Sequence, residues 1–272
     1  MRSDKLNFDE GLGTVYERFI LNDFFDALVK KHHIISALET PLYGMTGVTG
    51  INSVHLIEKG CKVTLLDSCQ NNIKEAANVW QLLPHSDSKY EILHHTNLSA
   101  LPFQNNAFDL VWNFAALWHV RDVAGLIREM VRVSSNLIVI MMPNKIQIGY
   151  FLRKYFLDKN FFDSVEETWA DINKISYELN KSGANMVSQG VLDVPPWPDT
   201  CMPIGDILKK LKIKRSEKVN NNWKWDIVSY YRGKNQTLKQ KIEKFSFIER
   251  LNIPWQLKAL WAHHRYVIFS KN

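Results

Sequence analysis

The sequence has little cysteine and no long apolar run. Its three cysteines, Cys61, Cys69 and Cys201, form no CxxC pair among the 272 residues, which excludes a disulfide framework and a zinc knuckle. No stretch of eighteen or more apolar residues occurs, so the sequence predicts no transmembrane helix. The first residues lack the order of a charged and then an apolar region that is typical of signal peptides. We therefore expect a cytoplasmic protein.

Two further features are missing. The nine histidines show no metal-ligand spacing, so the sequence predicts no metal site. Internal repeats and low-complexity tracts are absent as well.

With 46% apolar residues, a chain of this length can bury one large core, or one core with an appended subdomain.

Charge is distributed unevenly along the chain. Residues 201–272 carry 16 Lys and Arg against 5 Asp and Glu, whereas residues 1–200 carry 18 against 23. The net charge of +6 therefore conceals a basic C-terminal quarter, which we interpret as a separate unit.

Helical and strand patterns alternate over the first half of the chain. Apolar residues at helical spacing predict helices over 14–34, 51–60, 71–83 and 122–133, the first capped by Thr14. Apolar, β-prone runs predict strands over 34–39, 61–67, 90–95, 108–114 and 136–143. This alternation indicates an α/β fold with a parallel sheet and helices on both faces. The loops that follow the strands then meet at one edge of the sheet.

A glycine loop follows the first predicted strand. Gly44, Gly47 and Gly50 are spaced by threes between that strand and a helix, where backbone N–H groups and free space suit a bound cofactor. Asp67 ends the second strand, where a carboxylate can accept both hydroxyls of a ribose. An ordinary turn would explain the glycines alone, but together with Asp67 they predict a cofactor that carries a nucleoside.

Six features follow one another in a familiar order. They are Glu39 at the first strand end, the glycine loop, Asp67, Asn97 before the LPF segment 101–103, the FDLV segment 108–111 and the ALWH segment 116–119. In this order they resemble the class I methyltransferases that use S-adenosylmethionine (SAM), specifically the small-molecule group around the ubiquinone and menaquinone enzymes. SAM carries a positive sulfonium and no phosphate, and no Lys or Arg lies between Glu39 and Glu58, as suits a cationic ligand.

The resemblance implies a Rossmann-like sheet, mostly parallel with an antiparallel last strand, and SAM as cofactor. The implied cofactor-binding residues are Glu39, Gly44, Thr46, Gly47, Gly50, Asp67, Asn97, Leu98 and Asn113. Asn97 stands where the family usually has an Asp that contacts adenine, although an Asn there also suits a turn. About five extra residues lengthen the loop between Glu39 and Gly50 relative to the family, which leaves open how the loop contacts SAM.

The family's domain order can be assigned to the whole chain. We expect a helical cover over 1–34, a SAM-binding core over 35–194, a basic and aromatic-rich helical cap inserted over 195–263, and a closing strand over 264–272. Within the core, 165–183 suits the last crossover helix and 184–194 the sixth strand. The cap is expected to lie over the pocket.

Candidate residues for the substrate side follow from these positions. His119 and His264 are candidate general bases, although His119 also suits a cap of the next helix beside Asp122. The candidate substrate-binding residues are aromatic: Tyr16, Phe19, Trp118, Trp197 and Trp261. Core packing is an equal explanation for Tyr16 and Phe19.

The basic segment allows three interpretations. It can face solvent as a lysine-rich surface, bind an anionic or lipid-like substrate, or hold single-stranded nucleic acid between its lysines and tryptophans. We expect a methyltransferase that acts on a small molecule, at an oxygen, nitrogen, sulfur or carbon atom. The alternatives are an RNA-modifying methyltransferase, which the basic segment would serve, and a SAM-fold protein without catalysis.

Overall fold

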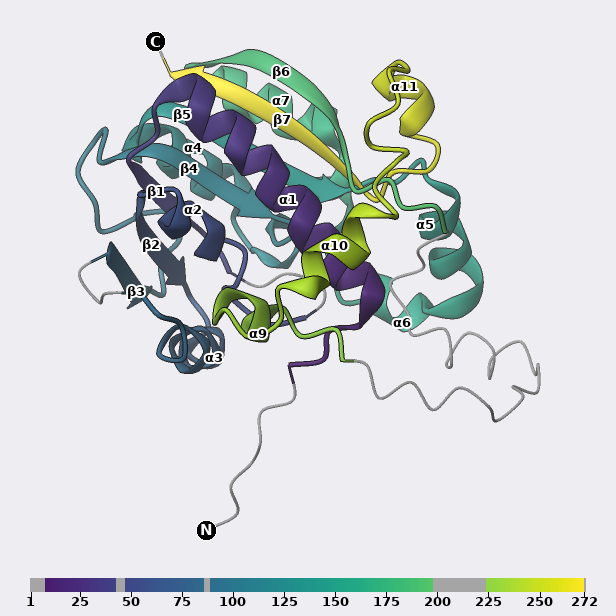
Figure 1. Cartoon of the computed structure of the whole chain (residues 1–272). Coiled ribbons are helices and arrows are strands. Elements are labelled where there is room, and N and C mark those ends of the chain that lie inside the picture. Colours follow the sequence, from purple (N-terminus) through teal and green to yellow (C-terminus); the bar gives the residue numbers. More distant parts are fainter. Residues whose placement is uncertain (1–7, 43–46, 86–88, 198–223, 272) are drawn as a thin grey trace.

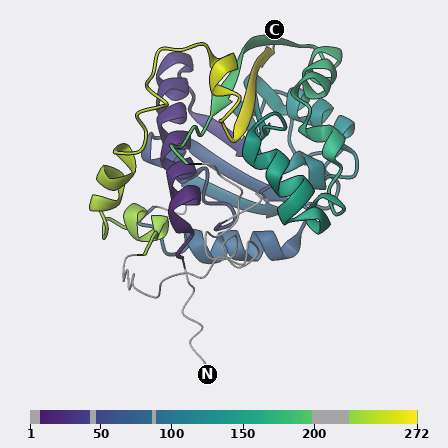
Figure 2. The same ribbon diagram turned by 90° about the vertical axis from the view of Figure 1, so that its right-hand side faces the viewer.

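The fold is built on one mixed sheet with a layer of helices on each face (Figures 1 and 2). The computed structural model describes residues 8–42, 47–85, 89–197 and 224–271. The strands lie in the order β3-β2-β1-β4-β5-β7-β6. Their bounds are β1 (Ser36–Glu39), β2 (Lys62–Asp67), β3 (Tyr90–His94), β4 (Phe108–Phe114), β5 (Ser134–Pro143), β6 (Ala184–Leu192) and β7 (His264–Lys271).

The sheet contains both parallel and antiparallel strand pairs. The pairs from β3 to β5 are all parallel, whereas β7 lies antiparallel between β5 and β6. The predicted sheet, with its antiparallel last strand, is therefore confirmed. Nearly all residues of β2, β4 and β5 are buried, because helices cover both faces, and this explains their continuous apolar runs.

Two apolar clusters fill the space between the sheet and its helices. One joins the sheet to α1, α2, α3, α9 and α10, and the other joins it to α4 and α7. The bounds are α1 (Gly11–His32), α2 (Val54–Glu58), α3 (Gln70–Trp80), η2 (Leu117–His119), α4 (Val123–Val133), α5 (Ile148–Leu152), η3 (Arg153–Leu157), α6 (Lys159–Phe162), η4 (Glu167–Ala170), α7 (Ile172–Lys181), α9 (Ile227–Tyr231), α10 (Thr237–Glu243) and α11 (Trp255–Lys258). Among these residues, no helix is long and apolar enough to cross a membrane.

Helix α1 begins three residues before the predicted cap at Thr14. It ends at His32, and the next residue, His33, adopts a left-handed conformation (φ 51°) and donates its backbone N–H to the carbonyl of Val29. Lys30, Lys31 and His32 lie in the last turn, where positive charge is favoured by the helix dipole. Because α1 ends only a few residues before β1 begins, its first turns lie toward the carboxyl edge of the sheet, where Thr14 and Arg18 lie next to Gly47 of the glycine loop.

The segment that was predicted to form a cap is described over residues 195–197 and 224–263. Helices α9 and α10 lie along α1 (Figure 1), where Tyr230 packs edge-on against Phe19 with ring centroids 4.8 Å apart. Tyr231 and Asn22 exchange hydrogen bonds of 2.9 and 3.0 Å. Their apolar side chains belong to the same cluster as those of α1, so these helices are packed onto the core through α1. The rest of the segment, 198–223, lies outside the described residues.

Candidate functional site

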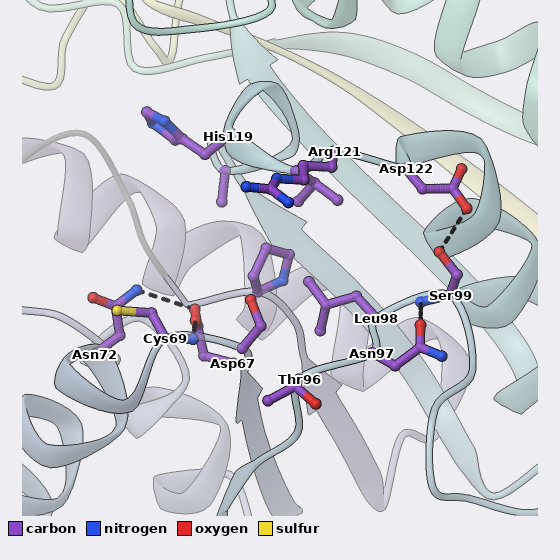
Figure 3. A pocket seen from close by; sticks show the side chains of 14 residues that line it. Asp67, Cys69, Asn72, Thr96, Asn97, Leu98, Ser99, His119, Arg121 and Asp122 are labelled. Carbon is purple, nitrogen blue, oxygen red and sulfur yellow. Dashed lines mark hydrogen bonds between the residues drawn. The ribbon is translucent and has the colours of Figure 1, made fainter.

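A cavity opens at the carboxyl edge of the sheet. Its volume is about 650 Å³, and it lies where the loops after β1, β2, β3 and β4 meet (Figure 3). This is the edge at which open α/β sheets bind ligands. The lining residues are Pro41, Asp67, Ser68, Cys69, Asn72, Thr96, Asn97, Leu98, Ser99, Ala116, His119, Val120, Arg121 and Asp122.

Asp67 lies at the cavity wall with its carboxylate largely committed. One oxygen accepts the backbone N–H of Leu42 at 2.8 Å and the side-chain amide of Asn72 at 3.2 Å. The other accepts the backbone N–H of Cys69 at 2.6 Å. A carboxylate offers about four acceptor positions, so roughly one remains for a ligand. Asp67 therefore joins the loops after β1 and β2 as well as lining the cavity.

The wall that follows β3 is a tight turn. Asn97 lies in the cavity lining, and its amide oxygen accepts the backbone N–H of Ser99 at 3.1 Å. The Ser99 hydroxyl donates to Asp122 at 2.7 Å, and Asp122 also accepts from the backbone of Gly125 at the start of α4. These bonds hold the pKa of Asp122 below its usual range. Asn97 thus stabilises a turn, which was the alternative role considered from the sequence. Its amide oxygen keeps a second lone pair that can accept another hydrogen bond.

His119 lies across the cavity from Asp67 in the view of Figure 3. Its ring contacts Trp118 and Phe161, at 6.0 and 6.4 Å between centroids. Desolvation by these neighbours lowers the pKa of His119, so the ring is neutral near pH 7. Asp122, and not His119, caps α4.

The described glycines of the loop serve packing. A side chain at Gly47 (φ 80°) would collide with Glu10 and Arg18 of α1, and one at Gly50 (φ 75°) would lie 2.7 Å from the Cβ atom of Ala76 in α3. Both residues adopt the left-handed region that favours glycine. The space beside these two glycines is occupied by Glu10, by Arg18 of α1 and by Ala76 of α3. Gly44 and Thr46 lie outside the described residues.

The sequence did not indicate that α1 places a positively charged side chain, that of Arg18, beside the glycine loop. Arg18 is 3% exposed, donates to the Asn52 side chain, and pairs with Glu10 at 3.4 Å and with Glu17 at 3.3 Å. Glu10 in turn accepts the backbone N–H of Val48 at 2.5 Å. The absence of Lys and Arg from the loop sequence thus does not mean that the folded loop lacks a positive neighbour.

Glu39 is buried, with 1% of its surface exposed. It accepts the hydroxyl of Ser53 at 2.6 Å, and Ser53 accepts the indole N–H of Trp112 at 3.1 Å. Burial raises the pKa of Glu39 to about 7, against the opposing effects of Ser53, Arg18 and Asn52. Glu39 was predicted to bind the cofactor together with Asp67 and Asn97. Unlike these two residues, it does not belong to the cavity lining.

Replacing Glu39 with glutamine is expected to flatten the pH dependence of stability. The Glu39 carboxyl keeps its proton up to about pH 7 in the folded protein but loses it near pH 4.5 when unfolded. Between these values the folded state binds more protons, so the free energy of unfolding falls as the pH rises, by up to roughly 1.4 kcal/mol for each unit of pKa difference. Urea unfolding of both proteins from about pH 5 to about pH 8 measures this.

The difference between the two proteins isolates Glu39 from other groups. Burial also raises the pKa values of Glu17 and Glu249 to about 7, so the wild type and the variant share those contributions. If both curves of unfolding free energy against pH have the same slope, Glu39 does not carry a raised pKa.

Four other predicted residues do not belong to the cavity lining. The amide of Asn113 donates to the carbonyl oxygens of Thr40 and Pro41, each at 3.1 Å, so Asn113 positions Pro41 and does not itself face the cavity. Trp118 is 1% exposed and belongs to the core beneath α4. Phe19 packs against Tyr230. Trp261 donates its indole N–H to the carbonyl of Pro195 at 2.6 Å.

The remaining candidates form a second polar group beneath α1. Tyr16 contacts Trp197, with 5.4 Å between ring centroids, and its hydroxyl lies 3.4 Å from Glu249. His264 lies against the ring of Phe114 at the end of β4, with 4.6 Å between centroids. The Tyr16 hydroxyl also donates to the carbonyl of Val194 at 3.4 Å, and the neighbouring Asp193 lies 3.7 Å from His264. None of Tyr16, Trp197 and His264 belongs to the cavity lining.

Three acids of this group were missed. Glu17 and Asp193 flank His264, and Glu249 accepts the backbone N–H of Val194 at 2.5 Å. Although burial raises it, the pKa of Asp193 is held below its usual range by the charge of His263 and its hydrogen bond. Only the fold brings these residues together, so no short sequence motif could have indicated them.

A family model matches part of the chain. Residues 45–136 match the model of a methyltransferase domain, which spans the loop after β1 and continues into β5. Residues 45–136 therefore form a methyltransferase domain, of the class I SAM-dependent type. Its cofactor is SAM. The match does not distinguish the ubiquinone and menaquinone group that the motifs resemble.

Solved structures share the fold of this methyltransferase at low sequence identity. Magnesium protoporphyrin IX methyltransferase (ChlM) from Synechocystis PCC 6803, with bound S-adenosylhomocysteine (SAH), is 11% identical, with 96% of this chain and 85% of that chain covered and a TM-score of 0.55. The [4+2]-cyclase SpnF is 12% identical, with 92% and 80% covered and a TM-score of 0.53. No curated protein matches the chain in sequence.

Proposed function

We propose that this methyltransferase transfers the methyl group of SAM to a small-molecule acceptor, and that the cavity at the carboxyl edge of β1 to β4 holds the nucleoside part of SAM. The observation that carries the proposal is the position of Asp67 in that cavity, at the end of β2. A carboxylate at this point suits a ribose hydroxyl.

The residues present fit SAM in size and charge. A volume of about 650 Å³ lies within the range of roughly 300–1,000 Å³ that is usual for small-molecule sites. The charged side chains of the lining are Asp67, Asp122 and Arg121, so negative charge prevails, as suits a positive sulfonium. Leu98, which is 8% exposed, offers an apolar surface for the adenine ring.

Three residues of the cavity lining have defined tasks in this proposal. Asp67 accepts a ribose hydroxyl with its remaining acceptor position, and Asn97 accepts the adenine amino group with its second lone pair. SAM supplies an activated methyl group, so the protein chiefly has to align the acceptor and exclude water. His119 takes a proton from the acceptor where the acceptor must lose one, because its ring is neutral near pH 7.

Aromatic residues beneath α1 support a small acceptor. Tyr16 packs against Trp197, and His264 packs against Phe114, which lies two residues before Ala116 in the cavity lining. Aromatic side chains of this kind suit a small molecule better than an extended polymer.

Calorimetry with SAM and SAH tests the cofactor site, and mass spectrometry of candidate acceptors tests the transfer. We expect both ligands to bind and the product to gain the mass of a methylene group. SpnF is described as a cyclase, so the fold alone does not determine the reaction. If neither ligand binds at millimolar concentration, the non-catalytic alternative replaces this proposal. Steeply salt-dependent RNA binding would instead favour an RNA substrate.

A further inference from the structure

Three potential metal ligands converge in the buried group beneath α1. Glu17 of α1, Asp193 after β6 and His264 at the start of β7 each offer one ligand atom, and these atoms lie within 4.8 Å of one another. His264 Nδ1 is 3.8 Å from Glu17 Oε2 and 3.7 Å from Asp193 Oδ2. All three residues are at least nine-tenths buried, with 8%, 1% and 5% of their surfaces exposed.

Neighbouring residues hold both carboxylates in place. Arg18 donates to Glu17 Oε1 at 3.3 Å, so that Oε2 faces His264. The ring of His263 bonds Asp193 Oδ2 at 2.7 Å. Outer partners of this kind orient the ligands of metal sites and fix which atom faces the ion.

Two atoms of the group are left without hydrogen-bond partners among the described residues. They are Asp193 Oδ1 and His264 Nδ1. A buried polar atom without a partner is costly, and such atoms often mark the place of a bound ion or water. Two carboxylates within 4.8 Å of each other also repel in a buried environment, unless positive charge lies between them.

We propose that Glu17, Asp193 and His264 bind one divalent transition-metal ion. One imidazole nitrogen with two carboxylate oxygens suits Zn²⁺, which takes nitrogen and oxygen ligands in a tetrahedral arrangement. Three protein ligands leave a fourth position open, as in catalytic zinc sites. The spacing of the histidines predicted no metal, because the three ligands lie far apart in the chain and only α1 and the β6–β7 edge bring them together.

The open fourth coordination position of the ion determines which class of small molecule can bind to it. It accepts a hydroxyl, thiol or carboxylate, and a divalent ion lowers the pKa of a bound hydroxyl or thiol. His264 touches Phe114, and Ala116, two residues further, lines the cavity. The ion would therefore hold the methyl acceptor beside the cofactor. This role rests on the function proposed above, whereas metal binding itself does not.

Metal analysis of the untagged, full-length protein tests the site without SAM. The protein is treated with EDTA, incubated with ZnCl₂, desalted and analysed by mass spectrometry of its metal content. We expect one zinc ion per chain in the wild type. Loading with Co²⁺ provides a second measurement on the same protein, because a tetrahedral Co²⁺ site absorbs strongly in the visible range.

Matched variants separate ligands from their neighbours. His264→Gln and Asp193→Asn should retain no zinc, whereas His263→Gln, which removes an outer partner, should bind zinc roughly 10–100-fold more weakly. His94→Gln, whose ring lies exposed near Ser68, should bind as the wild type does. Circular dichroism verifies that each variant is folded.

Two results would overturn the metal site. One is a folded wild type that retains no zinc and shows no visible Co²⁺ band. The other is zinc retention that His264→Gln and Asp193→Asn leave unchanged. Because no cofactor is present, either result is independent of whether the protein transfers methyl groups.

Discussion

Replacing Asp67 with alanine is expected to weaken SAM binding by at least tenfold. The remaining acceptor position of Asp67 can make a charge-assisted hydrogen bond to a ribose hydroxyl, worth up to about 3 kcal/mol. The substitution also removes the acceptor for Leu42, Cys69 and Asn72, so the loops after β1 and β2 lose their common anchor. Calorimetric titration with SAH measures the affinity, and thermal unfolding measures the accompanying loss of stability.

A carboxylate at the opposite edge of the sheet provides the control. Asp109 at the start of β4 accepts the backbone N–H groups of Ile35 and Ser36, each at 3.0 Å, and thus joins β4 to β1 as Asp67 joins β2 to the β1 loop. Asp109→Ala should lower stability in a similar way while leaving SAH affinity unchanged. Equal SAH affinity in Asp67→Ala and the wild type would show that the cofactor does not depend on this carboxylate.

The sheet could be predicted from sequence because its signals are local. Strand β4 has the predicted bounds 108–114, and β7, over 264–271, lies within the closing strand predicted over 264–272. Buried strands that are covered on both faces show continuous apolar runs, which need no knowledge of the rest of the chain. The position of Asp67 at the cavity also followed from its place at a strand end.

Side-chain roles were harder to predict, because they depend on packing between distant elements. Gly47 and Gly50 resembled cofactor glycines, but α1 and α3 fill the space beside them. Trp118 lies one residue before His119, yet the turn of η2 directs its indole into the core and leaves the histidine at the cavity. Glu17 and Asp193 meet only because α1 crosses the edge formed by β6 and β7.

The charge pattern was also an incomplete guide. The basic excess of residues 201–272 suggested a separate unit, but Leu238 and Ile242 of α10 are buried in the same cluster as α1. A helix can carry lysines on its outer face while its apolar face joins the core. Net charge thus described the surface of this segment and not its packing.

Replacing Arg18 with methionine is expected to lower the free energy of unfolding by about 3–5 kcal/mol, because removing one partner of a buried ion pair leaves the other charge uncompensated. Here two carboxylates, those of Glu10 and Glu17, lose their partner, and Asn52 loses a donor. Methionine keeps most of the side-chain volume, so lost charge and not a cavity dominates the effect. Urea unfolding at constant pH measures the change.

Lys59→Met is the matched control, since it removes a cation from an ion pair that is about 40% exposed, with Asp26 at 2.8 Å. Exposed pairs of this kind contribute roughly 0–1 kcal/mol. Both substitutions remove one positive charge, so a larger loss of unfolding free energy in Arg18→Met than in Lys59→Met is due to the burial of the Arg18 ion pairs. Should both substitutions cost the same, Arg18 would not be the buried link between α1 and the glycine loop. The loop would then owe its position to the Glu10–Val48 bond and to the close contacts of Gly47 and Gly50 with their neighbouring helices.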